Sequence, residues 1–505
     1  MKYSIYLCLT MFILASPLAA EEKMGMLEGT IISRDIAKNE IIVQHGEVKG
    51  VMGAMTMGYQ VRGQMVATLP KDGMKIAAIL HESNGTLWLT DVKPSASHAM
   101  SSMQHQPMPG MQHEAMPGMQ RMKPDTTADF LMRQASGTSM NPGAAPMHMT
   151  MTQRGDWMLM LHGLAFVSQV IQSGPRGGDK FFSTNWIMGM ADRPLGGGHL
   201  MLRSMLSLEP ITVGKKYPEL FQTGETIDHR PIIDAQHPHD FFMELAAEYA
   251  HPITDKTIGF IYVAPFGDPS LGPVAYPHRA SASEIPQAAL GHHVQDSTHI
   301  AGSVITIGAQ SGMFGYGFSG FHGREPDENR WDIDTGRIDS WAARATFDPS
   351  ANLTAQISTG HLTHPEAAEP GNIQRTTASV AYSVPQWDSS LIFGHNKKSS
   401  GHSTNSWLAE SVFRFQERNY ITGRAESVDK DELFATGGKF RIKALTLGYS
   451  RDVLTMRDFV GAVGGNVTGY SIPAAIKPYY GTPHSFYIFL RVRGHGEAMH
   501  GMHSM

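Results

Sequence analysis

The feature that most constrains this chain is a segment of about ten residues with alternating polar and apolar side chains, repeated from residue 156 to residue 493. Glycine, proline, asparagine and aspartate separate the repeats, of which about 14 to 16 can be counted. In the last repeat one face is entirely apolar, with the side chains of Phe486, Ile488, Leu490 and Val492. A period of two residues is that of a β-strand, so most of the chain is predicted to form strands.

Strands with this alternation suit a membrane-spanning β-barrel, in which lipid-facing and lumen-facing side chains alternate. A soluble β-sandwich or propeller also alternates, but it needs a dense aliphatic core, and neither face of these repeats supplies one. We therefore predict an all-β protein whose residues 153–493 form a large antiparallel β-barrel of about 14 to 16 strands. The barrel is expected to lie in the outer membrane, in contact with its lipid.

The N-terminus has the features of a secretory signal peptide over residues 1–20. Lys2 provides the positive charge, residues 5–15 form a short apolar core, and Ala19 and Ala20 precede an acidic pair. The apolar core is too short to span about 30 Å of hydrocarbon as a helix. Cleavage would remove Cys8, the one cysteine of the chain, so neither disulfides nor thiolate chemistry are expected in the mature protein.

Residues 21–95 are predicted to form a separate small domain. Apolar or alternating runs such as residues 29–35 and 40–45 are separated by turns, including Asn84-Gly85. Five short strands in about 70 residues suit a small closed barrel of the OB type.

The small domain carries a group of soft-metal ligands, His45, Met52, Met55 and Met57. In a strand, Met55 and Met57 point to the same face, so both thioethers can reach one ion. Thioethers are neutral and polarisable, and together with an imidazole nitrogen they favour monovalent copper or silver over hard cations. The alternative for this pair is that methionine fills gaps in an apolar core.

The stretch from His45 through Met52-Gly53-Ala54-Met55-Thr56-Met57 to Leu87-Trp88-Leu89 resembles the CusF family of periplasmic copper and silver chaperones, which are small five-stranded OB-like barrels. The resemblance implies that His45, Met55 and Met57 bind Cu(I) or Ag(I) as cargo. The family prototype has a tryptophan that caps the ion through a cation–π contact where this chain has Met52. Met52 is then either a further sulfur ligand or a sign that the cap is lost, and whether His45 or Met52 completes the site stays open.

Residues 96–152 are rich in Ser, Pro, Gly, Gln, Met and His, and they are predicted to be a disordered linker because they lack any strand or helix period. Disordered methionine and histidine side chains can wrap a soft ion without a fixed site. The possible secondary ligands are Met108, Met111, Met116, Met119, His105, His113, Met147, His148, Met149 and Met151. The C-terminal tail, residues 494–505, repeats this composition.

A methionine-rich leader before an outer-membrane barrel is also similar in architecture to copper resistance proteins of the CopB/PcoB type. Methionine makes up 33 of the 505 residues, beside 25 histidines. The net charge of −5 provides no footprint for nucleic acid, so no DNA or RNA partner is expected. The resemblances imply a periplasmic domain that sequesters copper or silver ions, or hands them to an envelope efflux pump or another periplasmic carrier.

The barrel region has its own group of possible ligands, His237, His239, His292 and His293. Three roles are compatible with these histidines: solvated loop residues, ligands along an exit route for an ion, or ligands of the catalytic metal of an enzyme. The chain has no nucleophile elbow, phosphate loop or dinucleotide fingerprint, so we expect a binding protein rather than an enzyme, with no organic cofactor. A passive pore that carries a chaperone domain is the remaining alternative.

Overall fold

The computed structural model describes residues 23–94, except 37, 47, 49, 50, 53, 54, 84 and 85, and residues 126–495, except 297–299 and 368–370. The chain divides into two compact units, residues 1–119 and residues 120–505. The predicted signal peptide, linker residues 95–125 and tail residues 496–505 lie outside the described residues. Among the described residues, no helix is long and apolar enough to cross a membrane.

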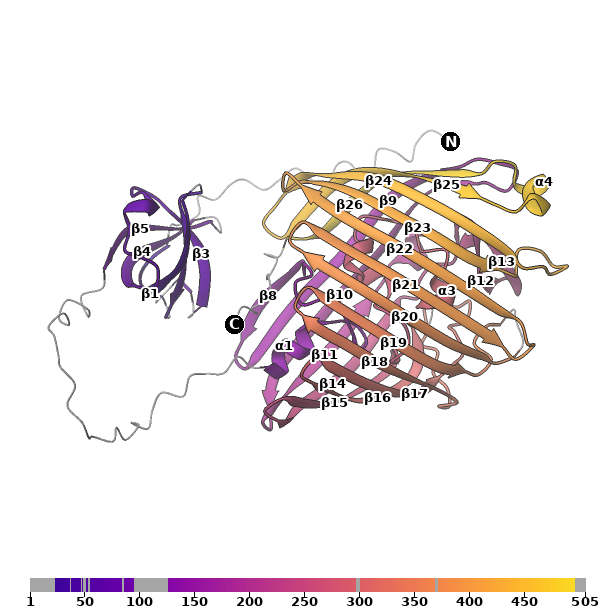
Figure 1. The fold of residues 1–505 in the computed structure, drawn as a ribbon, viewed down its shortest axis with the longest axis horizontal. Coiled ribbons are helices and arrows are strands. Elements are labelled where there is room, and N and C mark those ends of the chain that lie inside the picture. Colours follow the sequence, from indigo (N-terminus) through magenta and orange to yellow (C-terminus); the bar gives the residue numbers. More distant parts are fainter. Residues whose placement is uncertain are drawn as a thin grey trace. The chain divides into compact units, whose positions relative to one another are not determined.

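The first unit contains a closed five-stranded barrel, as predicted (Figure 1). Its strands are β1 (Lys23–Asp35), β2 (Glu40–His45), β3 (Met55–Val61), β4 (Lys75–Ser83) and β5 (Thr86–Pro94), with the 3-10 turn η1 (Val66–Thr68) between β3 and β4. The long strand β1 pairs with both β2 and β4, and a register shift after Ile31 lets it bend around the barrel. Apolar side chains such as Leu27, Val43 and Leu80 fill the interior.

The second unit is a closed antiparallel barrel of sixteen strands, β9 to β11 and β14 to β26, in which β26 pairs with β9 to close the wall. Strand β8 pairs with the first part of β9, where β26 ends. The strands are β8 (Met149–Arg154), β9 (Trp157–Gln172), β10 (Asp179–Leu195), β11 (Gly198–Leu206), β14 (Phe242–Thr254), β15 (Thr257–Gly267), β16 (Ala301–Ser311), β17 (Phe314–His322), β18 (Ser340–Ser350), β19 (Leu353–Leu362), β20 (Ile373–Val384), β21 (Trp387–Lys398), β22 (Ser403–Phe415), β23 (Asn419–Lys430), β24 (Phe440–Thr455), β25 (Phe459–Ser471) and β26 (His484–Gly494).

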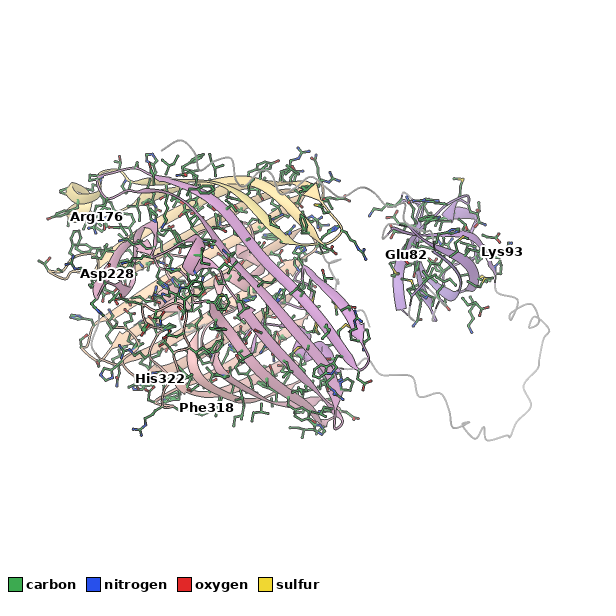
Figure 2. All side chains as sticks on the ribbon, turned by 180° about the vertical axis from the view of Figure 1, so that it is seen from behind. Glu82, Lys93, Arg176, Asp228, Phe318 and His322 are labelled. Atoms are coloured by element: carbon green, nitrogen blue, oxygen red, sulfur yellow. The ribbon has the colours of Figure 1, made fainter. Side chains whose placement is uncertain are left out.

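The wall of this barrel is apolar outside and polar inside. Leu445 and Leu447 of β24 are more than half exposed, and Phe318, labelled in Figure 2, is another exposed side chain. Inside, Glu410 accepts hydrogen bonds from Arg279 and Arg424, and all three are buried. An exposed apolar belt around an ionic interior is the arrangement of an outer-membrane β-barrel, because lipid rather than water surrounds the wall. The predicted fold class is therefore confirmed.

The two ends of the barrel differ in the length of their connections. Turns of a few residues follow β10, β14, β16, β18, β20, β22 and β24, and the wall also begins and ends at this edge. At the other edge, residues 207–241 carry α2 (Glu209–Thr212), β12 (Tyr217–Ile227) and β13 (Arg230–Gln236), and residues 268–300 carry η3 (Tyr276–His278), η4 (Ala280–Ala282) and α3 (His292–Gln295). The connection before β26 contains η5 (Ala474–Ile476) and α4 (Lys477–Tyr480). The η4 and α3 turns contact β21 and β22 and occupy the lumen (Figure 1).

The segment before β8 also enters the lumen, which corrects the prediction that all of residues 96–152 are disordered. Residues 126–148 contain α1 (Thr126–Met132), β6 (Gln134–Ser136) and β7 (Ser139–Met140), and β8, which pairs with the wall strand β9, begins at Met149 rather than at residue 153. Gln134 Nε2 donates to Glu248 Oε1 at 2.8 Å, and Arg344 Nη2 donates to the hydroxyl of Thr138 at 2.7 Å. The ionic wall supplies the partners that offset the ordering entropy, although the segment is poor in branched residues.

Candidate metal sites

The predicted site of the small domain lies where β2 ends and β3 begins. The register pairs His45 with Met55 and Val43 with Met57, and residues directly opposite in an antiparallel pair lie on the same face. His45 is only 5 % exposed, and Met57 packs against the apolar interior. The side chain of Met55 lies outside the described residues, so its part in the site stays a prediction.

Tyr59 joins His45 to Met52. The Tyr59 hydroxyl lies 3.2 Å from Met52 Sδ and forms a hydrogen bond with His45 Nε2. His45 Nδ1 lies 2.7 Å from the carbonyl oxygen of Gly46. Because a carbonyl only accepts, Nδ1 carries the proton and Nε2 presents its lone pair to the tyrosine.

An ion that binds His45 Nε2 therefore has to displace the Tyr59 hydroxyl. Burial raises the pKa of Tyr59, so this hydroxyl stays protonated and remains a donor. The sequence pattern did not identify Tyr59, because a tyrosine four residues after Met55 looks like an ordinary core residue of the strand. Its inward position, opposite Ile41, gives it this role.

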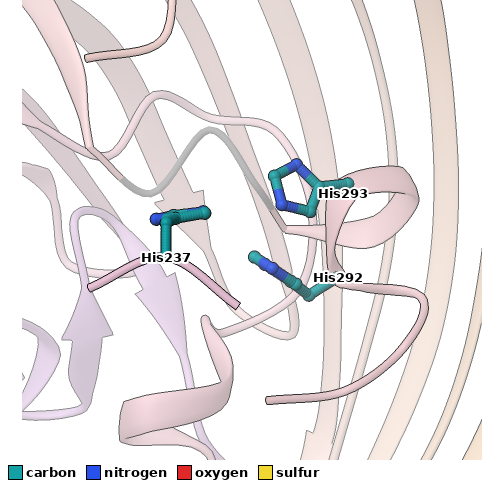
Figure 3. Close-up of side chains that lie close together, drawn as sticks. All are labelled: His237, His292 and His293. Carbon is teal, nitrogen blue, oxygen red and sulfur yellow. The ribbon is translucent and has the colours of Figure 1, made fainter. Parts of the chain in front are cut away.

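Three of the barrel histidines meet inside the lumen (Figure 3). His237 follows β13, while His292 and His293 begin α3. One ring nitrogen of each histidine lies within 4.8 Å of those of the other two, and all three residues are less than one tenth exposed. Their interpretation as solvated loop residues is therefore wrong.

His239 is not part of this group, although it was predicted together with His237. Its backbone N–H and its Nδ1 lie 2.8 Å and 3.0 Å from Glu209 Oε2. Extended backbone would place His237 and His239, which are two residues apart, on the same face. Residues 237–240 have left strand β13, so that rule does not hold there.

Acidic and basic side chains surround the three histidines. Glu225 Oε1 lies 3.1 Å from His237 Nε2, and Arg330 pairs with both Glu225 and Asp240. His293 also belongs to a second group with Glu325 and Glu366, whose ligand atoms again lie within 4.8 Å of one another. Burial, followed by the charge of Arg330, lowers the pKa of His237 well below its usual value, so this imidazole is neutral at pH 7.

A second cluster, the methionine cavity, lies in the half of the barrel nearer the short turns. The cavity has a volume of about 120 Å³, and its lining includes Met147, His148, Met149, His162, Met188, Met190 and His278. His278 Nε2 lies 3.1 Å from Met205 Sδ beside it. Three residues predicted as linker ligands, Met147, His148 and Met149, are thus part of the folded barrel. Met151 packs against an apolar cluster that includes Met149, but it does not line the cavity.

Sequence reasoning missed the wall residues of this cavity. Met188 and Met190 form the same Met-x-Met pattern as Met55 and Met57. Within a wall strand, however, this pattern cannot be told from the ordinary alternation of the strand. The other predicted linker ligands, Met108, Met111, Met116, Met119, His105 and His113, lie outside the described residues.

No protein-family model and no curated protein sequence matches the chain. Among solved structures, the anion-selective porin from Comamonas acidovorans is 12% identical, with a TM-score of 0.44, and the match covers 67% of this chain and 99% of the porin. Salmonella typhi OmpF, solved with daunomycin, is 9% identical, with a TM-score of 0.46, and covers 68% of this chain and 100% of OmpF. Apo-CusF residues 6–88 from Escherichia coli are 22% identical, with a TM-score of 0.15, over 16% of this chain and 99% of that one.

Proposed function

We propose that this protein is an exported Cu(I)- or Ag(I)-binding protein of the cell envelope, which sequesters the ion or hands it on and is anchored by its outer-membrane barrel. The observation that carries the proposal is the convergence of His45 Nε2 and Met52 Sδ on the Tyr59 hydroxyl, next to the strand pair that holds Met55 and Met57.

The donor set argues for a soft monovalent ion. Two or three thioethers and one imidazole carry no negative charge. Such a neutral donor set does not balance the charge of a dehydrated divalent hard cation, whereas it suits a soft ion with a single positive charge. Met52 and Met57 both pack against the apolar interior of the small barrel, which limits access of water and oxidants to the site. In this proposal Met52 takes the place next to the ion and replaces the tryptophan cap of the CusF family.

The orientation of the barrel supports a periplasmic small domain. Outer-membrane barrels have short turns on the periplasmic side and longer loops outside. Residues 126–148 enter the lumen next to the short turns, where α1 packs against Ala250 and Ile258. A carrier or efflux pump of the periplasm is the partner that this orientation favours.

The methionine cavity is a second argument for soft-metal handling. It combines thioethers from the wall, including Met149 at the start of β8, with Met147 from the segment that precedes β8, close to the periplasmic edge in this orientation. A passive open pore is the weaker alternative, because α3, η4 and residues 126–148 all occupy the lumen.

Metal titration of residues 21–95 tests the proposal, since this unit has its own closed barrel and apolar interior. We expect one equivalent of Cu(I) or Ag(I) to bind, and Met55→Ile combined with Met57→Ile to abolish tight binding while it preserves volume and strand propensity. Met65→Ile, at an exposed methionine outside the site, is the matched control. Unchanged Ag(I) affinity in the double variant would refute the proposal.

A further inference from the structure

We propose that His237, His292 and His293 form a second metal site inside the large barrel, which binds a divalent transition metal ion of borderline hardness, Cu(II) or Zn(II). This site differs from the thioether site in its ligands, its ion and its place in the chain. The inference goes beyond the proposed function and does not depend on it.

The hydrogen bonds around two of the histidines fix which nitrogen is available to an ion. His237 Nδ1 lies 3.0 Å from the carbonyl oxygen of Pro238, so it carries the proton and Nε2 presents a lone pair. His292 Nε2 lies 3.2 Å from Gln236 Oε1, which also accepts a hydrogen bond from Gln222 Nε2 at 2.9 Å. His292 Nε2 is then the donor, and Nδ1 is the ligand nitrogen.

A carboxylate lies beside His237 as well. His237 Nε2 is 3.1 Å from Glu225 Oε1, and the other oxygen of Glu225 is paired with Arg330. Glu225 is therefore in a position to add negative charge beside a cation that the three imidazoles hold.

The ligand chemistry selects the ion. Neutral imidazole nitrogens are the ligands that Cu(II) and Zn(II) prefer, and three of them with an open position is a known zinc arrangement. His293 belongs in addition to the group formed with Glu325 and Glu366 on the neighbouring connections, so carboxylate oxygens lie close to one of the three histidines.

Burial makes an incidental cluster an unfavourable explanation. His292 is 1 % exposed, and the centroids of the three rings lie 4.1 to 6.3 Å apart, with the rings tilted or edge-on to one another. Buried imidazoles at this spacing repel one another when they are protonated. An ion held by all three would keep them neutral.

The test is a Co(II) titration of the full-length protein purified in detergent and first stripped of metal with a chelator. Co(II) reports imidazole ligation by its visible absorption, and thioethers bind it weakly. We expect the wild type to take up one more tightly bound equivalent than the variant His237→Gln/His292→Gln/His293→Gln, and Zn(II) to displace it. The loss in affinity should exceed the roughly 10- to 100-fold that removal of a merely supporting partner costs.

Two controls separate the site from folding and from the thioether site. His239→Gln changes a buried histidine of the same connection that is paired with Glu209, and it should keep the Co(II) spectrum. The double variant of Met55 and Met57 should keep it as well, so that failure of either metal site is visible separately. An unchanged spectrum in the triple variant would overturn the proposal, and so would equal loss in His239→Gln. If the triple variant does not fold, His292→Gln alone should lower the affinity for Zn(II), and unchanged affinity would refute the site.

Discussion

The two barrels of this chain place their polar and apolar side chains in opposite ways. The small barrel is filled by apolar residues such as Leu80, which is fully buried, and charged side chains such as Asp91 and Lys93 are exposed. The large barrel buries Arg424 and Glu410 and exposes Leu447. The same period of two produces both, so the alternation alone does not say which face is inside. The surrounding solvent decides: water covers the polar face in one case, and lipid covers the apolar face in the other.

The largest effect is expected from an ion pair in the lumen of the large barrel. Glu410 accepts hydrogen bonds from Arg279, from Arg424 at 2.9 Å and from Ser281 at 2.9 Å. Glu410→Ala leaves two buried guanidinium groups without their shared partner, which should lower the free energy of unfolding by about 3–5 kcal/mol. Denaturant unfolding of the refolded barrel in lipid vesicles measures the effect.

The conservative variant Glu410→Gln sharpens this test because it keeps the volume and loses only the charge. It should fall between the wild type and Glu410→Ala. A change of less than about 1 kcal/mol in Glu410→Ala would mean that water reaches the lumen and replaces the lost partner.

The next effect concerns the apolar interior of the small barrel. Leu80→Ala opens a cavity among fully buried side chains, which should lower the stability of this domain by about 2–5 kcal/mol. Trp88 is the one tryptophan of residues 21–95, so its fluorescence in the isolated segment follows the domain through a denaturant titration.

Leu447→Ala in the large barrel is the matched comparison, since it truncates a leucine that lies on the outer face and is 55% exposed. Its effect on barrel stability should be well below that of Leu80→Ala, because lipid fills the space that the side chain leaves. Equal losses in the two barrels would contradict the assignment of inner and outer faces.

The same contrast explains which parts of the fold could be predicted from the sequence. Alternation is a local property, so both barrels and the approximate strand number were predicted from it. The order of residues 126–148 was not, because it depends on lumen partners such as Arg344 and Glu248, which are far away in the sequence. Composition correctly identifies a segment that has no apolar core of its own. It does not show that such a segment can become ordered by packing inside the barrel that follows it.

The candidate sites divide in the same way. His45, Met55 and Met57 are neighbours in two adjacent strands, so spacing and resemblance were sufficient to propose them. His237 and His292 meet because two long connections fold into the lumen. The sequence offered this only as one alternative, an exit route for an ion, because a loop pattern does not say where the loop folds. Tyr59 and Met205 were missed for a related reason: each looks like a wall or core residue until its neighbour across the barrel is known.

A smaller effect should distinguish Tyr59 from an ordinary core tyrosine. Tyr59→Phe removes the hydroxyl that His45 Nε2 must release before an ion binds, and a hydrogen bond of this kind contributes about 1 kcal/mol. The affinity of residues 21–95 for Cu(I) should therefore rise by about fivefold, as measured by competition with a chromogenic chelator. Thr90→Val, which removes the hydroxyl 2.8 Å from Nε2 of His81 elsewhere in the domain, should leave the affinity unchanged. Weaker binding by Tyr59→Phe would instead make the tyrosine a supporting ligand.

The smallest effect is expected at the surface of the small barrel, and it completes the comparison with Glu410. Lys93 Nζ and Asp91 lie 2.8 Å apart, a separation close to that between Arg424 and Glu410, but both side chains of the surface pair are more than half exposed. Water screens such a pair, and holding two long side chains in one geometry costs entropy, so its net contribution is within about 0.5 kcal/mol. Lys93→Ala should accordingly leave the denaturation midpoint of residues 21–95 almost unchanged, in low salt and in high salt alike. A loss comparable with that of Glu410→Ala would show that distance, rather than burial, sets the strength of ion pairs in this protein.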